Sequence, residues 1–223
     1  MSKILMTLVN SQDIFRLNQE FLSLSATSPK VHGKVECFKA LFNGSKVKNG
    51  KNNNFNNYID FNSQQKSNFG FNTQNWFEYN DPGSLNAASQ HFDALLKCFS
   101  ESFPDFDFST IHPWNFKLIQ SPEQAQSDMV WKFQSVLPDS DQFVSHIWSY
   151  LDKEMNPGNC SIYIYESDRP DAFSAMGAVF NLSYFILNEK MNKVVLIHMR
   201  EGASDFGSDD LDGFDDDVDD GYY

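Results

Sequence analysis

The fold of this chain is decided by the stretch Val179-Phe-Asn-Leu-Ser-Tyr-Phe-Ile-Leu187, Asn188-Glu-Lys-Met-Asn192, Lys193-Val-Val-Leu-Ile-His-Met-Arg200. Its two outer parts are rich in β-branched and aromatic residues, and the polar part between them is short enough for a hairpin. Apolar residues occupy both alternating sets of positions towards the end of the first part, so both faces are expected to be covered. We therefore predict a hairpin over 179–200 with neither face open to solvent.

Immediately after this hairpin the chain becomes acidic. Residues 201–223 contain ten of the 30 acidic residues and none of the 17 lysines and arginines, and the first 200 residues carry a net charge of only −3. Binding to a nucleic-acid backbone needs clustered Lys and Arg, so no direct sequence-specific nucleic-acid binding is expected. We predict an acidic disordered tail over 201–223, which favours partners with basic surfaces.

Upstream of the hairpin, three helices and one strand are predicted. The helices over 84–103, 121–137 and 141–155 each carry apolar residues at helical spacing. Ser121-Pro-Glu-Gln124 supplies a cap, a proline at the first helical position and a capping-box glutamine. Residues 160–165 alternate as a short strand. The expected core-facing residues of the helices are Leu85, Ala88, Phe92, Leu95, Leu96, Phe99, Phe103, Ala125, Val130, Phe133, Val136, Leu137, Val144, Ile147, Trp148, Leu151 and Met155.

The first part of the chain is predicted to contribute two strands and a helix. Residues 3–9 form a short apolar run, and residues 31–42 alternate as a long strand. Between them, the pattern predicts a helix from Ser11 to Leu24, with Ser11 placed to cap its first turn. Its apolar residues are Ile14, Leu17, Phe21 and Leu24.

Residues 43–80 contain twelve asparagines and no sustained hydrophobic period. Such a segment buries too little apolar surface to offset its ordering entropy, which predicts a disordered insertion. Two interpretations of its aromatic residues stay open: loop side chains without a binding role, or transient contacts to a partner. These residues are Phe55, Tyr58, Phe61, Phe69, Phe71, Trp76 and Phe77.

Together these elements predict an α+β fold in which helices pack on a mainly antiparallel sheet. The length of 223 residues and the 41% hydrophobic content suit one core. We therefore predict a single domain built from residues 1–42 and 81–200, interrupted by the disordered insertion 43–80 and followed by the acidic tail.

Cysteine usage and hydropathy bear on the compartment. Cys37, Cys98 and Cys160 show no CxxC spacing, and their odd number leaves one unpaired in any disulfide scheme. Reduced thiols in the nucleus or cytosol are the simpler interpretation. The apolar run in residues 1–9 is too short for a signal peptide, and no run approaches membrane-spanning length. No membrane association is expected.

Two motifs formally match chemical sites. Asp105-Phe-Asp107-Phe-Ser109 fits the Asp-x-Asp signature of phosphate-transferring haloacid-dehalogenase enzymes, but it follows a helix and a proline rather than a buried parallel strand. The context favours the alternative, a hydrogen-bonded corner. Ser208-Asp-Asp210-Leu-Asp212-Gly213 loosely fits a calcium loop, yet a solvated acidic tail is favoured because the exit helix is missing.

The remaining signatures of catalysis are absent from the sequence. There is no phosphate-binding glycine loop, nucleophile elbow or Cys–His signature. The histidines have no metal-ligand spacing with one another or with the cysteines. We therefore expect no enzyme activity, no metal and no cofactor. The histidines are His32, His91, His112, His146 and His198.

Three blocks, in order along the chain, carry a family resemblance. The first is Phe103-Pro-Asp-Phe-Asp-Phe-Ser109. The second is Trp148 followed by Asp152 and Glu154, with the strand Cys160-Ser-Ile-Tyr-Ile-Tyr165 just after it. They are similar to a Pro-Asp-Tyr-Asp-Phe-Ser box, a Trp-x-x-x-Asp-x-Glu helix and the strand after that helix in the Maf-one family of global repressors of RNA polymerase III transcription.

The third block is the hairpin itself. Ser183-Tyr-Phe-Ile-Leu-Asn188, with Lys193-Val-Val after the turn, resembles the family's Asn-Tyr-Phe-Phe-Tyr-Asn hairpin and its Arg-Ile-Val continuation. Phe180 stands where the family has a tryptophan, and the family's basic turn is here Glu189-Lys-Met-Asn-Lys193. The resemblance covers the chain except for the insertion.

The resemblance implies a non-enzymatic negative regulator that binds RNA polymerase III and blocks its recruitment to the promoter-bound initiation factor. It also implies control by regulatory kinases and phosphatases under stress, and a protein found in both nucleus and cytoplasm. The candidate phosphorylation sites are Ser45, Ser63 and Ser67, which lie near lysines, and Ser28, which precedes a proline. Charge added at such sites alters docking without disturbing a core.

The hairpin also supplies the candidate partner-binding residues. Its apolar side chains are expected to be core, which leaves Lys190, Lys193 and Arg200 for a partner. We expect a monomer. The alternative function is that of an adaptor or chaperone whose acidic tail binds basic proteins.

Overall fold

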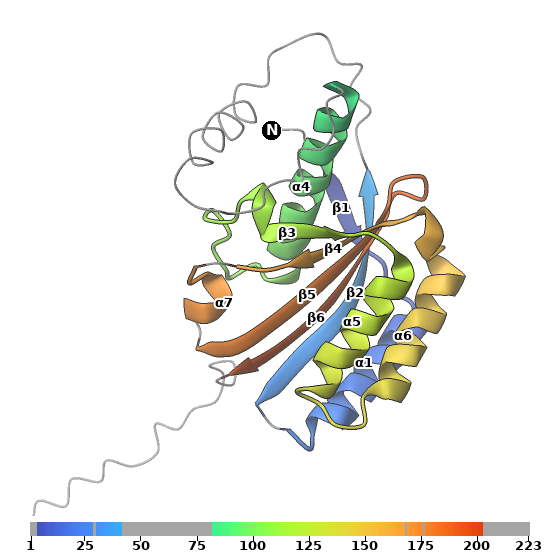
Figure 1. The fold of residues 1–223 in the computed structure, drawn as a ribbon, viewed down its shortest axis with the longest axis vertical. Helices are drawn as coiled ribbons and strands as arrows, with labels where there is room; N and C mark the ends of the chain where they lie inside the picture. Colours follow the sequence, from blue (N-terminus) through green and yellow to red (C-terminus); the bar gives the residue numbers. More distant parts are fainter. Residues whose placement is uncertain (1–3, 29, 42–81, 168, 176, 203–223) are drawn as a thin grey trace, which may run out of the picture.

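A computed structural model describes residues 4–28, 30–41, 82–167, 169–175 and 177–202 (Figure 1). In these ranges, six strands form one antiparallel sheet in the order β1-β2-β6-β5-β4-β3. The predicted α+β class with a mainly antiparallel sheet is confirmed. The strands are β1 (Leu5–Leu8), β2 (Val31–Leu41), β3 (Phe116–Ile119), β4 (Ser161–Tyr165), β5 (Ala178–Asn188) and β6 (Lys193–Gly202).

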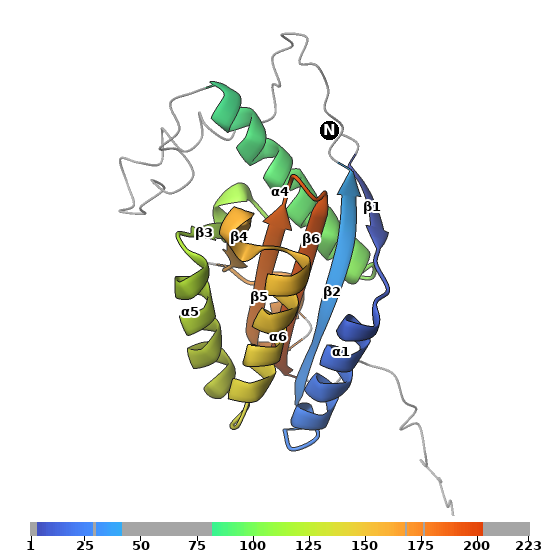
Figure 2. The ribbon, with the colours of Figure 1, turned by 90° about the vertical axis from the view of Figure 1, so that its right-hand side faces the viewer.

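Helices pack on both faces of the sheet (Figures 1 and 2). One face carries α1, α5 and α6, and the other carries α4 and the short α7. Each face therefore encloses its own hydrophobic cluster. The helices are α1 (Gln12–Ser25), α4 (Pro82–Ser102), α5 (Pro122–Gln134), α6 (Asp141–Glu154) and α7 (Ala172–Ala175), and 3-10 turns lie at Pro113–Asn115 (η1) and Pro157–Asn159 (η2).

The hairpin predicted over 179–200 is confirmed as β5 and β6. Both strands are central, because β6 lies between β2 and β5, and β5 lies between β6 and β4. All residues from Leu182 to Asn188 and from Val194 to Arg200 are buried. The turn closes through a hydrogen bond from Asn192 N to Glu189 O of 3.1 Å. Both faces of the hairpin are covered because helices pack on each side of the sheet.

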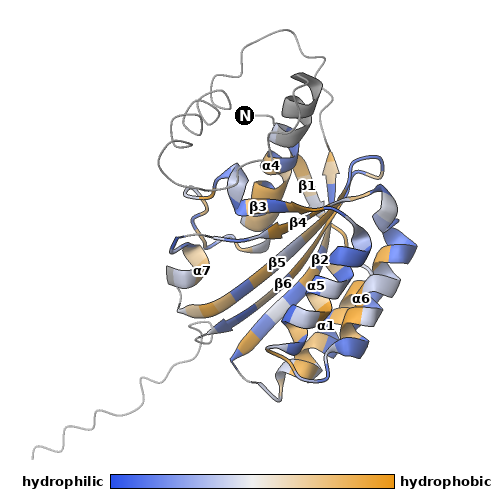
Figure 3. Cartoon of the chain, viewed as in Figure 1, coloured by the Kyte–Doolittle hydropathy of each residue, from blue (hydrophilic) through white to orange (hydrophobic). Residues whose placement is uncertain are grey.

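The cluster beneath α1, α5 and α6 follows the predicted periodicities. Ser11 caps α1 by accepting from Ile14 N at 3.2 Å, and Ser121 caps α5 by accepting from Gln124 N at 3.2 Å. Figure 3 shows apolar residues along the strands and between α1 and α6. Each helix thus turns one apolar stripe to the sheet. The large residues of this cluster include Ile14, Leu17, Phe21, Met129, Phe133, Phe143, Ile147, Trp148 and Leu151.

The opposite cluster is built around aromatic rings. Phe99 of α4 is fully buried, and Phe173 of α7 packs with it at 5.6 Å between ring centroids. Residues from the irregular chain after α4 and from the sheet complete the cluster. Its aromatic members are Phe38, Phe99, Phe108, Phe116, Tyr163, Tyr165, Phe173 and Phe185, with Phe92, Phe103 and Phe106 partly buried against them.

The structure differs from the sequence prediction at several elements. The edge strand β3 and the four-residue α7 were not predicted, since each is short and follows proline-containing chain. α5 ends at Gln134 rather than near Pro138, and β6 continues two residues past Arg200 to Gly202. Among the described helices, none combines the length and apolar character needed to cross a bilayer.

Candidate protein-binding surface

The three cations predicted to face a partner lie in different environments. Lys190 is exposed on the β5–β6 turn. Lys193, at the start of β6, has a side chain 24% exposed, and its Nζ lies 3.2 Å from Glu154 Oε2. Arg200 is only 4% exposed, so the exposure predicted for it is wrong. Its position in β6, a central strand covered on both faces, explains the burial.

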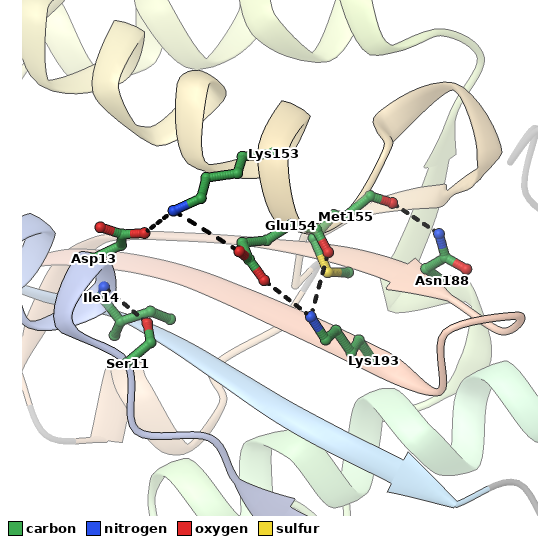
Figure 4. A network of polar contacts seen from close by, with 8 residues as sticks. All are labelled: Ser11, Asp13, Ile14, Lys153, Glu154, Met155, Asn188 and Lys193. Carbon is green, nitrogen blue, oxygen red and sulfur yellow. Dashed lines mark hydrogen bonds and ion pairs between the residues drawn. The ribbon is translucent and has the colours of Figure 1, made fainter.

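One side of the turn is held by α6 (Figure 4). Asn188 Nδ2 donates to Met155 O at 2.7 Å, and Lys193 pairs with Glu154. Lys153 donates to Asp13 Oδ2 at 2.7 Å, and this interaction lowers the pKa of the Asp13 carboxyl. The end of α6 is therefore tied both to the start of α1 and to the hairpin turn.

The other side of the turn is held by α4. The buried His91 has its Nε2 against the Glu189 carboxylate and its Nδ1 2.7 Å from the Tyr163 hydroxyl. The contact with His91 lowers the pKa of Glu189, although partial burial opposes it. The carboxylate of Glu189 is thus held against His91 although its side chain is 55% exposed, and the turn presents both Glu189 and Lys190 to solvent.

Exposed apolar residues lie beside this turn. Leu5 of β1 and Leu41 of β2 are direct cross-strand partners, 57% and 43% exposed. Ala40 N donates to Asn192 O at 2.8 Å, which places the end of β2 against the turn (Figure 3). We call the surface formed by Leu5, Lys39, Leu41, Lys190 and Met191 the corner.

The corner is exposed because the helices on this face cover only part of β2. Alternate residues of a strand share a face, so Val35, Cys37, Lys39 and Leu41 point the same way. Val35 and Cys37 are buried in the α1–α5–α6 cluster, whereas Lys39 and Leu41 are exposed. The corner combines three apolar side chains with two lysines. Such a surface is suited to a partner segment that mixes apolar and acidic residues.

Of the four candidate phosphorylation sites, one lies in the described residues and three lie outside them. Ser28 lies in the bend between α1 and β2, half-buried, where its carbonyl accepts from Val31 N at 2.8 Å. Ser45, Ser63 and Ser67 lie outside the described residues, as do the insertion 43–80 and the calcium-like motif. Phosphate acceptance by these serines stays a prediction.

The Asp105–Ser109 motif forms a hydrogen-bonded turn, as its sequence context favoured, and is separate from the surface called the corner. Asp107 accepts from Ser109 N at 2.9 Å and from Ser109 Oγ at 3.0 Å, which lowers the pKa of its carboxyl. Burial raises the pKa of the thiols of Cys37, Cys98 and Cys160, so these groups are poor nucleophiles. The described residues contain no group of three or more side chains suited to hold a metal ion.

A family model described as the Maf1 regulator matches residues 31–198. The chain belongs to the Maf1 regulator family. The match contains all three sequence blocks that carried the resemblance, and in the fold these blocks are the chain after α4, the end of α6 with β4, and the β5–β6 hairpin.

Two relatives of this Maf1-family chain are named repressors of RNA polymerase III transcription. The one from Dictyostelium discoideum is 27% identical over 107 residues, covering 48% of this chain and 38% of the relative. The one from Schizosaccharomyces pombe is 25% identical over 139 residues, covering 58% of this chain and 57% of the relative. The chain thus spans less than two thirds of either relative. A crystal structure of citrus MAF1 is 18% identical, with a TM-score of 0.49, covering 85% of this chain and 96% of that one.

The sequence alone does not reveal most of the corner. Alternation along the predicted strand 31–42 places Lys39 and Leu41 on the same side as Val35 and Cys37, as the structure has them. What it does not show is where the covering helices end. Leu5 was part of a short predicted strand, and its pairing with Leu41 depends on a contact between distant parts of the chain.

Proposed function

We propose that this protein is a negative regulator of RNA polymerase III transcription. It binds the polymerase and blocks its recruitment to the promoter-bound initiation factor. The observation that carries the proposal is the match of the Maf1 regulator model over residues 31–198. The names of the two relatives, both repressors of RNA polymerase III transcription, support it.

The fold supports a mechanism by contact rather than by catalysis. In the described residues, Cys37 and Cys98 are buried and Cys160 is half-buried, and the exposed large apolar side chains include Leu5, Leu41 and Met191. In this proposal, Lys190 and the other residues of the corner contact the polymerase, with Lys193 accessible at its edge. Arg200 is left out of the contact because it is buried.

Control by phosphorylation is part of the same proposal. Kinases add phosphate to Ser28 or to the serines of residues 43–80, and phosphatases remove it under stress. A phosphate adds about two negative charges and three strong acceptors. Because residue 42 follows directly on Leu41 of the corner, charge added there would act near the proposed contact. The protein is proposed to divide between cytoplasm and nucleus and to act as a monomer.

The deciding experiment is promoter-specific transcription with purified RNA polymerase III and its initiation factor, with and without the protein. Transcription should fall as the protein is added, and preassembled promoter complexes should resist. A matched pair of variants, Lys190→Glu at the corner and Lys30→Glu between α1 and β2, separates a local contact from net charge. Only Lys190→Glu should weaken repression. Unchanged transcription together with no binding of the polymerase would reject the proposal.

The acidic stretch after Gly202 favours a second function, an adaptor or chaperone for basic proteins. Removing residues 203–223 distinguishes the two. Loss of binding to basic proteins such as histones, with polymerase binding retained, would assign the tail its own activity. Retained repression without the tail would place the regulatory contact on the folded part.

A further inference from the structure

Most lysines of the described ranges have a carboxylate partner, whereas those of the corner do not. Lys39 and Lys190 are exposed, and no carboxylate of a described residue lies within 4.0 Å of either ammonium group. Lys39 is the direct cross-strand partner of Lys193, whose charge is already matched by Glu154. The corner therefore offers two uncompensated positive charges. The lysines with a carboxylate partner are Lys34, Lys97, Lys117, Lys132, Lys153 and Lys193.

The same corner offers apolar surface and an open sheet edge. Leu5, Leu41 and Met191 are 57%, 43% and 42% exposed. Among the described strands, β1 pairs only with β2, so within this part of the chain its outer edge has backbone groups available for an added strand. A segment that suits this surface carries acids spaced among apolar side chains and contains few residues that oppose an extended conformation.

The chain itself contains such a segment. Residues 209–223 read Asp-Asp-Leu-Asp-Gly-Phe-Asp-Asp-Asp-Val-Asp-Asp-Gly-Tyr-Tyr, with no Lys, Arg or Pro. Leu211, Phe214 and Val218 are each flanked by acids on at least one side. Alternation of carboxylates with single apolar residues matches the mixture of lysines and apolar side chains at the corner.

The length of the chain allows this contact. β6 runs from the turn to Gly202, about 30 Å for its ten residues. The twelve residues from Gly202 to Phe214 span at most about 40 Å when extended. Both faces of β6 are covered, so the tail has to pass around the edge of the sheet, and the 21 residues from Gly202 to Tyr223, at most about 70 Å when extended, are long enough for that path.

The cations nearest to the point where the tail leaves the sheet are less suited to it. Lys30 O accepts from Gly202 N, and Arg169 is exposed near the start of β5, where Val179 is 86% exposed. Between residues 203 and 208 the tail has one acid, Asp205, and its dense charge begins only at Asp209. Those two cations thus lie beside the weakly charged part of the tail.

We propose that residues 209–223 of this chain dock on the corner, with carboxylates against Lys39 and Lys190 and apolar side chains against Leu5, Leu41 and Met191. The docked tail covers the corner, so any partner that binds there must displace it. Since part of the attraction is between exposed charges, salt weakens it, with a Debye length of about 8 Å at 0.15 M and about 3 Å at 1 M. This proposal concerns contacts within the chain and does not depend on binding to a polymerase.

The test uses the purified full chain with the photo-crosslinking residue benzoylphenylalanine in place of Phe214. After illumination, the monomer band is digested and the crosslinked peptides are identified by mass spectrometry. Crosslinks should join the tail to peptides containing residues 5–8, 39–41 or 189–192. The double variant Lys39→Glu/Lys190→Glu should reduce their yield about tenfold, because two attractive exposed pairs become repulsive. Salt at 1 M should reduce the yield in the parent chain.

The matched control is Lys30→Glu/Arg169→Glu, which makes the same change in net charge close to the exit of the tail. It should leave the corner crosslinks in place. Crosslinks that map near residues 30 or 169 and disappear in this control would overturn the proposal, as would crosslinks spread evenly over the surface. Equal thermal unfolding of the parent and both double variants shows that the fold is intact. If either double variant unfolds early, the single substitution Lys190→Glu against Lys30→Glu gives the same decision.

Discussion

One face of the sheet is covered by the three helices α1, α5 and α6, whereas the other is covered by α4, the short α7 and irregular chain between them. The helical face interleaves aliphatic and aromatic side chains from amphipathic helices. The other face is filled largely by aromatic rings that meet edge to face or in stacks around Phe99. One face of the sheet is therefore covered by regular helices, and the other is covered largely by packed aromatic side chains.

This difference decides how each face responds to change. A helix covers a face through several turns, so each of its side chains carries part of the packing. Around Phe99, one ring touches six others, those of Phe103, Phe108, Phe116, Tyr165, Phe173 and Phe185. Phe133 on the helical face has two aromatic neighbours, Phe21 and Phe143. The aromatic face depends more on a single residue.

The largest effect is expected for Phe99→Ala. Loss of a buried phenylalanine costs about 3–5 kcal/mol, and the loss of several aromatic pairs puts Phe99 at the upper end of that range. Phe133→Ala, also fully buried, is the matched substitution on the helical face and should cost about 1 kcal/mol less. Urea unfolding of both variants measures the difference. Equal losses of stability would show that the aromatic face depends on Phe99 no more than the helical face depends on Phe133.

A second prediction concerns acid sensitivity on the aromatic face. His198 is buried against Phe103 and Phe173, with its Nδ1 2.9 Å from Ser183 Oγ. Burial and the nearby charges of Lys34 and Arg200 lower its pKa to about 3. Below pH 6.5 the unfolded imidazole binds a proton that the folded one does not, so stability should fall as the pH drops towards 3.

The slope due to this group is at most about 1.4 kcal/mol per pH unit. His198→Gln keeps a hydrogen-bonding side chain beside Ser183 and has no proton to gain, so the variant should lose this part of the slope. Free energies of unfolding at pH 7, 6, 5 and 4 test it. An identical pH dependence of the parent and His198→Gln would contradict the assignment. His146→Gln, an exposed histidine, is the control.

A smaller loss is expected for Gly33→Ala on the helical face. A Cβ at Gly33 would lie 2.4 Å from His198 O of β6 and 2.5 Å from the Phe21 ring of α1, so β2 must move away from both elements. Overpacking of this kind costs about 1–3 kcal/mol. Gly158→Ala is the control, because its nearest neighbour would be Asn156 Oδ1 at 3.9 Å. If Gly33→Ala and Gly158→Ala unfold at the same temperature, the helical face accommodates the added methyl group without loss of stability.

The two faces also differ in how far the sequence predicts them. The helices of the helical face are given by local signals, namely caps at Ser11 and Ser121 and apolar residues at helical spacing in α6. The aromatic face depends on contacts between distant segments. Neither β3 nor α7 has a local pattern of its own, and their positions follow from Phe116 and Phe173 packing on Phe99.

The candidate surface shows the same limit. Lys190 was predicted to be exposed because it lies in a polar turn, and it is. Arg200 was predicted to be exposed because only the apolar side chains of the hairpin were expected to be core, but β6 is a central strand and both of its faces are covered. The corner needs the β1–β2 pairing and the point at which the covering helices end. Both are properties of the assembled fold and have no signal within a window of sequence.

The smallest effect is expected where the helical face meets the turn. Lys193 and Glu154 form a partly exposed pair at 3.2 Å, and such pairs contribute about 0.2–1 kcal/mol. A double-mutant cycle of Lys193→Met and Glu154→Gln measures their coupling, while Lys190→Met with Glu154→Gln is the control cycle and should give none. Coupling in the first cycle alone would show that α6 fixes the turn and leaves Lys190 free for a partner. Coupling of similar size in both would mean that Glu154 responds to the general charge of the turn, and Lys190 would then share in the stability of the helical face.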